Sequence, residues 1–255
     1  MQRLDMLLVE RGLVQSRTHA QRLIKGNKVK YLQNKQWQAT NKPGLKLEPD
    51  TELQVERDEA DRFASRGALK LLGALERSGL DVNGMTAIDV GQSTGGFTDC
   101  LLQAGAERVV GIEVGHDQLI ERLRNDPRVI CHEGVNGRDL PQDLLLSHTP
   151  DQRGYDLAVM DVSFISQTKI IPALAPLVRT GGNLICLVKP QFEVGKEGIG
   201  RGGIVRDASL YPQVESLIRD CYQQYGLSVK DYFESPIKGG DGNREFLIYA
   251  VKTPD

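Results

Sequence analysis

Apolar and polar residues alternate in a strand–helix rhythm over most of the chain, from residue 65 onward. Apolar runs of strand length are followed by stretches in which apolar residues recur at helical spacing. We expect strands at 85–90, 108–114, 128–132, 157–161, 182–188, 229–233 and 246–251, and helices at 66–78, 97–104, 117–125, 166–178 and 209–225. This alternation predicts an α/β domain, a doubly wound parallel sheet with helices on both faces.

The first 57 residues follow a different pattern. Apolar residues within 4–13 and 20–24 predict two short amphipathic helices that are broken near residues 12–16. Ser16 is the expected cap of the second helix and Gly26 its expected end. Residues 28–31 and 53–55 alternate like strands. We therefore predict a small α+β domain at 1–57, a linker at 58–64 and the α/β domain at 65–255.

Charge is distributed unevenly between these two parts. Residues 1–57 hold eleven Lys and Arg against six Asp and Glu, a net charge of +5, whereas the whole chain has a net charge of −2. A basic module on an acidic body is typical of a protein that contacts the phosphates of a polyanion. The alternative is a solvated basic face on a docking domain. The candidate contact residues are Arg3, Arg11, Arg17, Arg22 and Lys25.

Several functional classes are disfavoured by the sequence. The longest apolar runs have strand length, well short of the roughly 20 residues that a membrane span requires, and the N-terminus does not read as a signal peptide. The four cysteines are scattered without CxxC spacing, which predicts reduced core residues and no metal site. We therefore expect a cytoplasmic protein without a membrane partner.

The most informative segment is 89–99, DVGQSTGGFTD, which joins a strand end, a glycine-rich turn and a helix start. Gly91, Gly95 and Gly96 let the backbone pass close to a ligand, and the N–H groups of the following helix face the same place. Glu113 follows about 20 residues later, at a strand end where a carboxylate can accept ribose hydroxyls. The turn and this acid leave NAD and S-adenosylmethionine open. The absence of Gly-x-Gly-x-x-Gly spacing and of a Walker lysine weakens the dinucleotide and ATP hypotheses.

Four charged residues sharpen the prediction. Lys70 lies on the helix before the first strand of the large domain, and Asp161, Lys189 and Glu245 lie at strand ends. All four are expected to reach the carboxyl edge of the sheet, where ligands of such folds bind. Each has a structural alternative, a solvated helix lysine or a loop-capping acid. Together, two lysines and two acids predict a site that handles a substrate proton.

Two resemblances to known families extend this reading. Residues 3–17 resemble the small RNA-binding domain shared with ribosomal small-subunit protein four. The segments 65–71, 89–99, 160–166, 187–193 and 242–246 resemble the TlyA family, which is also labelled hemolysin-like. This resemblance implies a Rossmann-like, FtsJ-like methyltransferase domain that uses S-adenosylmethionine. It further implies 2′-O-methylation of cytidine in ribosomal RNA, with RNA or a ribosomal subunit as partner.

The TlyA resemblance also assigns roles to residues. The residues that match the Lys-Asp-Lys-Glu tetrad of ribose 2′-O-methyltransferases are Lys70, Asp161, Lys189 and Glu245. The residues that match the cofactor positions are Asp89, Gly91, Ser93, Gly95, Gly96 and Glu113, with Asn136 and Asp161 as further candidates. The chain departs from the family pattern where Gln92 replaces a small alanine and where His116 and Asp117 replace an aromatic residue and a glycine.

The implied mechanism is an in-line transfer of the sulfonium methyl group to a ribose hydroxyl. Lys189 is expected to meet the hydroxyl, either as a base or as an oriented cation, with Lys70 as its charge partner. The glycine-rich segment 194–206 is expected to be a mobile basic loop over the site, its alternative being a surface linker without a role. Rival functions are a non-catalytic RNA-binding factor, a membrane-active hemolysin and a small-molecule methyltransferase.

Overall fold

The computed structural model describes residues 1–14, 16–56 and 59–254. One compact unit ends at Arg62 and a second begins at Phe63. The predicted domain end at residue 57 and the first residue of the predicted linker, 58, lie outside the described residues. The rest of that linker includes a 3-10 turn, Glu59–Arg62.

The N-terminal unit packs two helices beside two small antiparallel sheets. Helix α1 (Leu4–Glu10) and helix α2 (Arg17–Lys25) bury their leucines in one apolar core. The hydroxyl of Ser16 accepts a hydrogen bond from the backbone N–H of His19 at 3.2 Å, which confirms the predicted cap. Residue 15, within the predicted break between the helices, lies outside the described residues.

The sheets of this unit are only partly those expected. The predicted strand pair is present as β2 (Val29–Gln33) with β5 (Leu53–Val55). Strand β3 (Gln36–Ala39) pairs with β2 on its other side and was not predicted, because its mostly exposed residues lack an apolar face. A second, two-stranded sheet joins β1 (Gln2–Arg3) to β4 (Lys46–Leu47).

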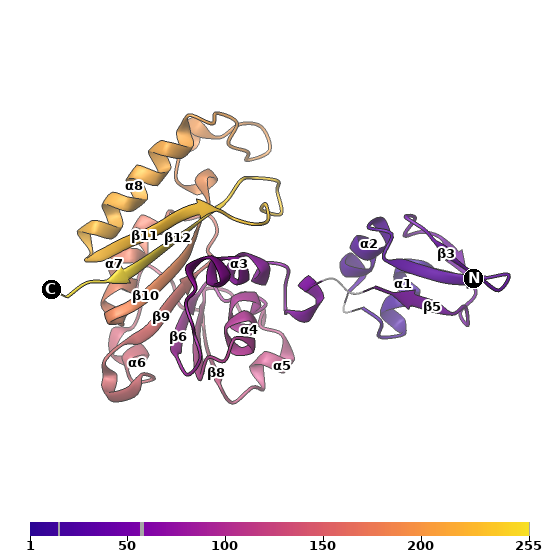
Figure 1. The fold of residues 1–255 in the computed structure, drawn as a ribbon, viewed down its shortest axis with the longest axis horizontal. Helices are drawn as coiled ribbons and strands as arrows, with labels where there is room; N and C mark the ends of the chain where they lie inside the picture. The colour runs from indigo at the N-terminus through magenta and orange to yellow at the C-terminus, as the bar shows by residue number, and fades with distance from the viewer. Residues whose placement is uncertain (15, 57–58, 255) are drawn as a thin grey trace. The chain divides into compact units, whose positions relative to one another are not determined.

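The larger unit is built on a seven-stranded sheet with the order β11-β12-β10-β9-β6-β7-β8 (Figure 1). Strands β6 to β10 are parallel, and β12 is antiparallel to both of its neighbours. The bounds are β6 (Thr86–Val90), β7 (Arg108–Glu113), β8 (Val129–Glu133), β9 (Tyr155–Met160), β10 (Val178–Val188), β11 (Leu227–Glu234) and β12 (Phe246–Lys252).

Alternating strand residues divide the core between the two faces of the sheet. In β6, Ile88 and Val90 belong to one buried cluster and Ala87 to the other. The first cluster includes residues of α6 (Gln142–Leu146), α7 (Ile171–Leu174) and α8 (Leu210–Gln224). The second includes residues of α3 (Ala68–Ser78), α4 (Gly96–Gln103) and α5 (Glu121–Arg124). Helices therefore cover both faces, and the predicted doubly wound α/β fold is confirmed.

Two predicted helices are shorter than expected. The segment 166–178 contains only α7, flanked by the 3-10 turns Gln167–Lys169 and Ala175–Leu177. Pro172 and Pro176 explain the break, because proline removes a backbone donor and crowds the preceding turn. The helix expected at 117–125 is reduced to α5.

The strand register brings predicted site residues to one edge. Met160 of β9 lies opposite Val90 of β6 on one side and Cys186 of β10 on the other. Val188 of β10 lies opposite Phe246 of β12. Because β12 runs antiparallel, its first residues lie at the edge where the parallel strands end. The residues that follow β9 and β10 and the residue that precedes β12 therefore converge.

Candidate active site

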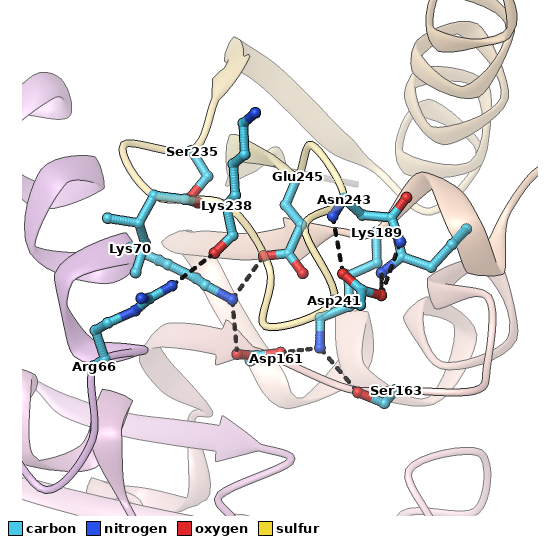
Figure 2. A network of polar contacts seen from close by, with 12 residues as sticks. Arg66, Lys70, Asp161, Ser163, Lys189, Ser235, Lys238, Asp241, Asn243 and Glu245 are labelled. Atoms are coloured by element: carbon cyan, nitrogen blue, oxygen red, sulfur yellow. Dashed lines mark hydrogen bonds and ion pairs between the residues drawn. The ribbon is translucent and has the colours of Figure 1, made fainter. Parts of the chain in front are cut away.

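Four charged side chains meet at this edge and form one network (Figure 2). The Nζ atom of Lys189 lies 2.6 Å from Oδ1 of Asp161. The Nζ atom of Lys70 lies 2.6 Å from Oε2 of Glu245 and 4.0 Å from Oδ2 of Asp161. The structure thus brings together all four residues of the predicted tetrad, with Asp161 between the two lysines.

The network is largely withdrawn from solvent. The side chain of Lys70 is 10% exposed and that of Glu245 only 3%. Burying a single charge is costly, but here two ammonium groups face two carboxylates, so that each charge is compensated at short range. Ser163, to which sequence reasoning gave no role, accepts a hydrogen bond from Lys189 at 3.0 Å. The cluster therefore holds its lysines in defined orientations.

Helix α3 is fixed against the loop that precedes β12. At Gly73, a Cβ atom would lie 2.9 Å from Cγ of Pro236, so the glycine permits a close approach. Arg66 donates a hydrogen bond to the carbonyl of Lys238 at 3.2 Å (Figure 2). The backbone N–H of Ser235 donates to the carbonyl of Glu245 at 2.8 Å. These contacts set the position of Lys70 relative to Glu245.

A cavity of about 600 Å³ opens beside the network, and Asp161 lines it. Among its other lining residues are Gly91, Ser93, Glu113 and Asn136, all predicted cofactor positions. The carboxylate of Glu113 accepts backbone hydrogen bonds from Ser93 and from Gly115, each at 2.8 Å. A carboxylate oxygen retains a further lone pair, so the fixed Glu113 side chain can still accept ribose hydroxyls. The cavity fits a nucleoside cofactor.

Close packing requires glycine at three positions of this turn. Gly91 has a φ of +84°, and a Cβ atom there would lie only 2.3 Å from the backbone oxygen of Asp161. Gly96 opens α4, and a Cβ atom there would lie 2.2 Å from Oγ of Ser65. Gly95 has a φ of +98° and packs against Leu123. Gly91 therefore lets the turn approach the end of β9, and Gly95 and Gly96 let it pack against residues 123 and 65.

Asp89 lies in the interior beneath this turn. Its side chain is fully buried and accepts a hydrogen bond from the hydroxyl of Thr98 at 2.7 Å. Burial raises the pKa of Asp89 to about 7, against the hydrogen bond from Thr98. Gln92 donates to the same hydroxyl at 2.9 Å and fills the space beside Gly111. The unusual glutamine is thus accommodated by a glycine on β7.

The predicted RNA-contacting residues are in different environments. Arg3 and Arg17 both donate to the buried carboxylate of Asp5, with Nε–O distances of 3.0 Å. The hydrogen bonds from Arg3 hold the pKa of Asp5 well below its usual range, against the effect of burial. The side chains of Arg3 and Arg17 are 43% and 55% exposed, so two oriented cations face solvent. Arg11 is instead bonded to the carbonyls of Thr51 and Pro49.

The remaining two candidates of the N-terminal unit also differ from each other. Arg22 pairs with Asp61, whereas Lys25, in the last turn of α2, is exposed. Arg22 is therefore engaged within the unit, and Lys25 is accessible to a partner.

The glycine-rich segment 194–206 is anchored at one end. The side chain of Asn243 accepts a hydrogen bond from the backbone N–H of Val205 and donates one to the carbonyl of Gly203, each at 3.0 Å. Asn243 had no predicted role. The basic residues of this segment, Lys196, Arg201 and Arg206, are exposed.

A doubly wound sheet with a glycine cradle at its carboxyl edge and an adjacent cavity is a nucleotide-binding architecture. The model of the FtsJ-like methyltransferase family matches residues 63–252, and that of the S4 domain matches residues 2–31. The chain belongs to the FtsJ-like methyltransferase family, and the predicted enzyme class is confirmed.

The chain is also similar to individual proteins over most of its length. It is 40% identical to the 16S/23S rRNA (cytidine-2′-O)-methyltransferase TlyA of Mycobacterium tuberculosis over 99% of this chain and 91% of that protein. It is 38% identical to Hemolysin A of Brachyspira hyodysenteriae over 74% and 77%. A solved structure described as a hemolysin from Streptococcus thermophilus is 42% identical and has a TM-score of 0.75, with 99% and 89% covered. The predicted resemblance to the TlyA family is confirmed.

The hemolysin name raises the question of membrane insertion. Among the described residues, the helices are too short or too polar to cross a bilayer.

Proposed function

We propose that this protein transfers the methyl group of S-adenosylmethionine to the 2′-hydroxyl of a cytidine in ribosomal RNA. The observation that carries the proposal is the network of Lys70, Asp161, Lys189 and Glu245 beside the nucleoside cavity. The activity for which the mycobacterial relative is named supports the choice of cytidine and of the ribose oxygen. The ribosomal substrate implies that the protein works in the cytoplasm.

Several residues hold the cofactor in this proposal. Glu113 accepts the ribose hydroxyls, and Gly91 and Ser93 line the turn against which the cofactor lies. Asn136 also lines the cavity and is assigned to the adenine side. When bound, S-adenosylmethionine supplies a methyl group on a positively charged sulfur, which is already activated for transfer.

The protein then has to orient the attacking oxygen and provide for its proton. The ammonium group of Lys189, which lies 2.6 Å from Asp161, holds the 2′-oxygen in line with the methyl group. Lys70 and Glu245 fix the other side of the ribose. As the oxygen takes the methyl group, the donor sulfur would leave with the electrons of the broken C–S bond. The hydroxyl proton would pass to the carboxylate of Asp161, the acceptor nearest to Lys189.

The N-terminal unit supplies RNA affinity in this proposal. Arg3 and Arg17 are held on Asp5 with their guanidinium groups open to solvent, and Lys25 is exposed. Arginine forks of this kind bind phosphate oxygens in a defined direction. The exposed cations of segment 194–206 extend the contact to RNA near the site.

The direct test is methyl transfer from labelled S-adenosylmethionine to separated small and large ribosomal subunits, with free ribosomal RNA alongside. We expect label in 2′-O-methylcytidine after digestion to nucleosides, and its loss with Lys189→Ala. Lys169→Ala, which removes an exposed lysine of the 3-10 turn Gln167–Lys169, is the matched control. Absence of label in every RNA by a protein that binds S-adenosylmethionine would overturn the proposal.

A further inference from the structure

Another cavity, of about 400 Å³, borders the charged network. Lys70, Lys189 and Glu245 line it together with Gln191 and Asp241. Given the proposed function, on which this inference rests, this is where the target nucleotide enters. Gln191 and Asp241 lie beyond the lysines and acids that face the ribose, and neither had a predicted role.

The N–H groups of two nearby residues donate to the carboxylate of Asp241. The backbone N–H and the side-chain amide of Asn243 both donate to its carboxylate, at 2.9 Å and 2.8 Å. The amide nitrogen of Gln191 also donates to this carboxylate, at 3.5 Å. Figure 2 shows Asp241 and Asn243 joined beside Lys189 and Glu245. The nearby donors are therefore already engaged.

This arrangement leaves acceptors for a ligand. Gln191 is only 5% exposed, yet its Oε1 atom has no hydrogen-bond partner among the described residues. A buried amide oxygen without a donor is unusual, and this one belongs to a residue that lines the cavity. The carboxylate of Asp241 keeps acceptor capacity as well. Burial acts to raise the pKa of Asp241, but the hydrogen bonds from Asn243 and the charge of Lys189 outweigh it and lower the pKa.

We propose that Asp241 and Gln191 select the target base by accepting hydrogen bonds from the 4-amino group of cytosine. Cytosine presents an amino donor at this position, which carboxylates accept well, whereas uracil presents a carbonyl oxygen. An acceptor placed against another acceptor is repulsive, so the same two groups reject uridine. The two side chains thus contact the base as acceptors, because the amide donors of Gln191 and Asn243 are already bonded within the protein.

The two residues proposed to contact the base lie close in sequence to residues proposed to hold the ribose. Gln191 follows Lys189 by two residues, and Asp241 lies four residues before Glu245. Asn243 holds this second segment to residues 203 and 205 through its side chain. The position of the base edge is therefore coupled to the position of the ribose, and a base that does not fit places its hydroxyl out of line.

The test compares cytidine and uridine at the methylated position of otherwise identical ribosomal RNA. Asp241→Asn keeps an oxygen for the backbone N–H of Asn243 but exchanges the other acceptor for a donor. We expect the ratio of cytidine to uridine methylation to fall about tenfold or more, the size of one lost base contact. Glu197→Gln removes the same charge from an exposed position of the neighbouring turn and is the matched control.

Gln191→Met provides a second variant, since it keeps the side-chain volume and removes the acceptor together with the long donor contact to Asp241. We expect it to lower the same ratio. Thermal unfolding midpoints of both variants show whether they are folded. An unchanged cytidine-to-uridine ratio in folded variants, or equal loss on both RNAs, would overturn the inference while leaving the proposed function intact. A wild-type protein that methylates neither RNA would overturn the proposed function itself.

Discussion

Lys189 and Asp161 form an ion pair of 2.6 Å between residues that directly follow two neighbouring parallel strands, β10 and β9. The pair depends on the strand register, because one carboxylate must face Lys189 with one oxygen and Lys70 with the other. A lysine so held cannot sample many rotamers, and its orientation is prepared before any substrate arrives.

Removing either lysine is expected to abolish methyl transfer. Lys189→Ala removes the group that orients the hydroxyl, and Lys70→Ala leaves Glu245 buried without its 2.6 Å partner. Loss of a group that orients the reacting hydroxyl lowers kcat by about 10²-fold or more. Single-turnover rates measure this loss, and calorimetry measures the affinity for S-adenosylmethionine, which should change little in Lys189→Ala. Equal loss of affinity and rate would show that Lys189 acts through the cofactor cavity.

Glu113→Gln is expected to weaken cofactor binding. The carboxylate accepts two backbone hydrogen bonds and faces the cavity, and a neutral amide can accept with only one oxygen. A charge-assisted hydrogen bond contributes about 1.5–3 kcal/mol, so we expect the Kd for S-adenosylmethionine to rise at least tenfold. The exposed Glu121→Gln is the control for charge. A Kd unchanged in both variants would exclude Glu113 from the cofactor site.

Gly91→Ala and Gly79→Ala separate backbone strain from crowding. Both glycines have positive φ, +84° and +65°, but a Cβ atom at Gly79 meets nothing within 4 Å. Gly79→Ala should therefore cost only the left-handed strain, about 1–2 kcal/mol. Gly91→Ala adds a clash at 2.3 Å with the backbone oxygen of Asp161 and should cost more, with loss of cofactor binding. Urea unfolding of both variants measures the difference, and equal costs would contradict it.

Asp89 is expected to make the stability of the protein depend on pH. Its pKa of about 7 lies above the ordinary value of 3.8, so the folded state binds a proton that the unfolded chain has lost. Between these two pH values, stability falls as pH rises, by up to about 1.4 kcal/mol per unit, and it levels off above pH 7. Asp89→Asn lacks this titration. Urea unfolding from pH 5 to pH 8 should show the variant gaining on the wild type up to pH 7, and parallel curves would contradict the prediction.

The arginines of the N-terminal unit should separate into two groups. Arg3→Ala and Arg17→Ala should each weaken RNA binding and reduce the slope of log K against log salt by about 1, as one phosphate contact is lost. Arg11→Ala should chiefly lower stability, because its guanidinium is bonded to the carbonyls of Thr51 and Pro49. Filter binding at several salt concentrations, with thermal unfolding alongside, tests this. Identical salt slopes for all three variants would show that pairing with the buried Asp5 does not decide which arginines contact phosphate.

Much of the fold was predictable because its signals are local. Strand β6 has an apolar pattern, the turn after it has three glycines, and Ser16 precedes an amphipathic helix. Strand β3 escaped prediction because polar residues pair through the backbone without leaving a pattern. The interruption at 166–178 was overlooked although Pro172 and Pro176 were visible, because the apolar spacing around them suggested a continuous helix.

For the site, residue order along the chain was enough to predict the four charged candidates and the glycine cradle, since Lys70 lies on the helix before β6 and the others adjoin strand ends. Contacts between distant residues depended on the folded chain. Two such contacts are the packing of Gln92 beside Gly111 and the hydrogen bonds of Asn243 to the backbone at 203 and 205. The unpartnered oxygen of Gln191 is likewise a property of the folded chain. Hydrogen bonds are short-ranged and directional. Which donors are already engaged, and so which acceptors still face a substrate, is therefore decided only when the strands have paired and the loops between them have packed.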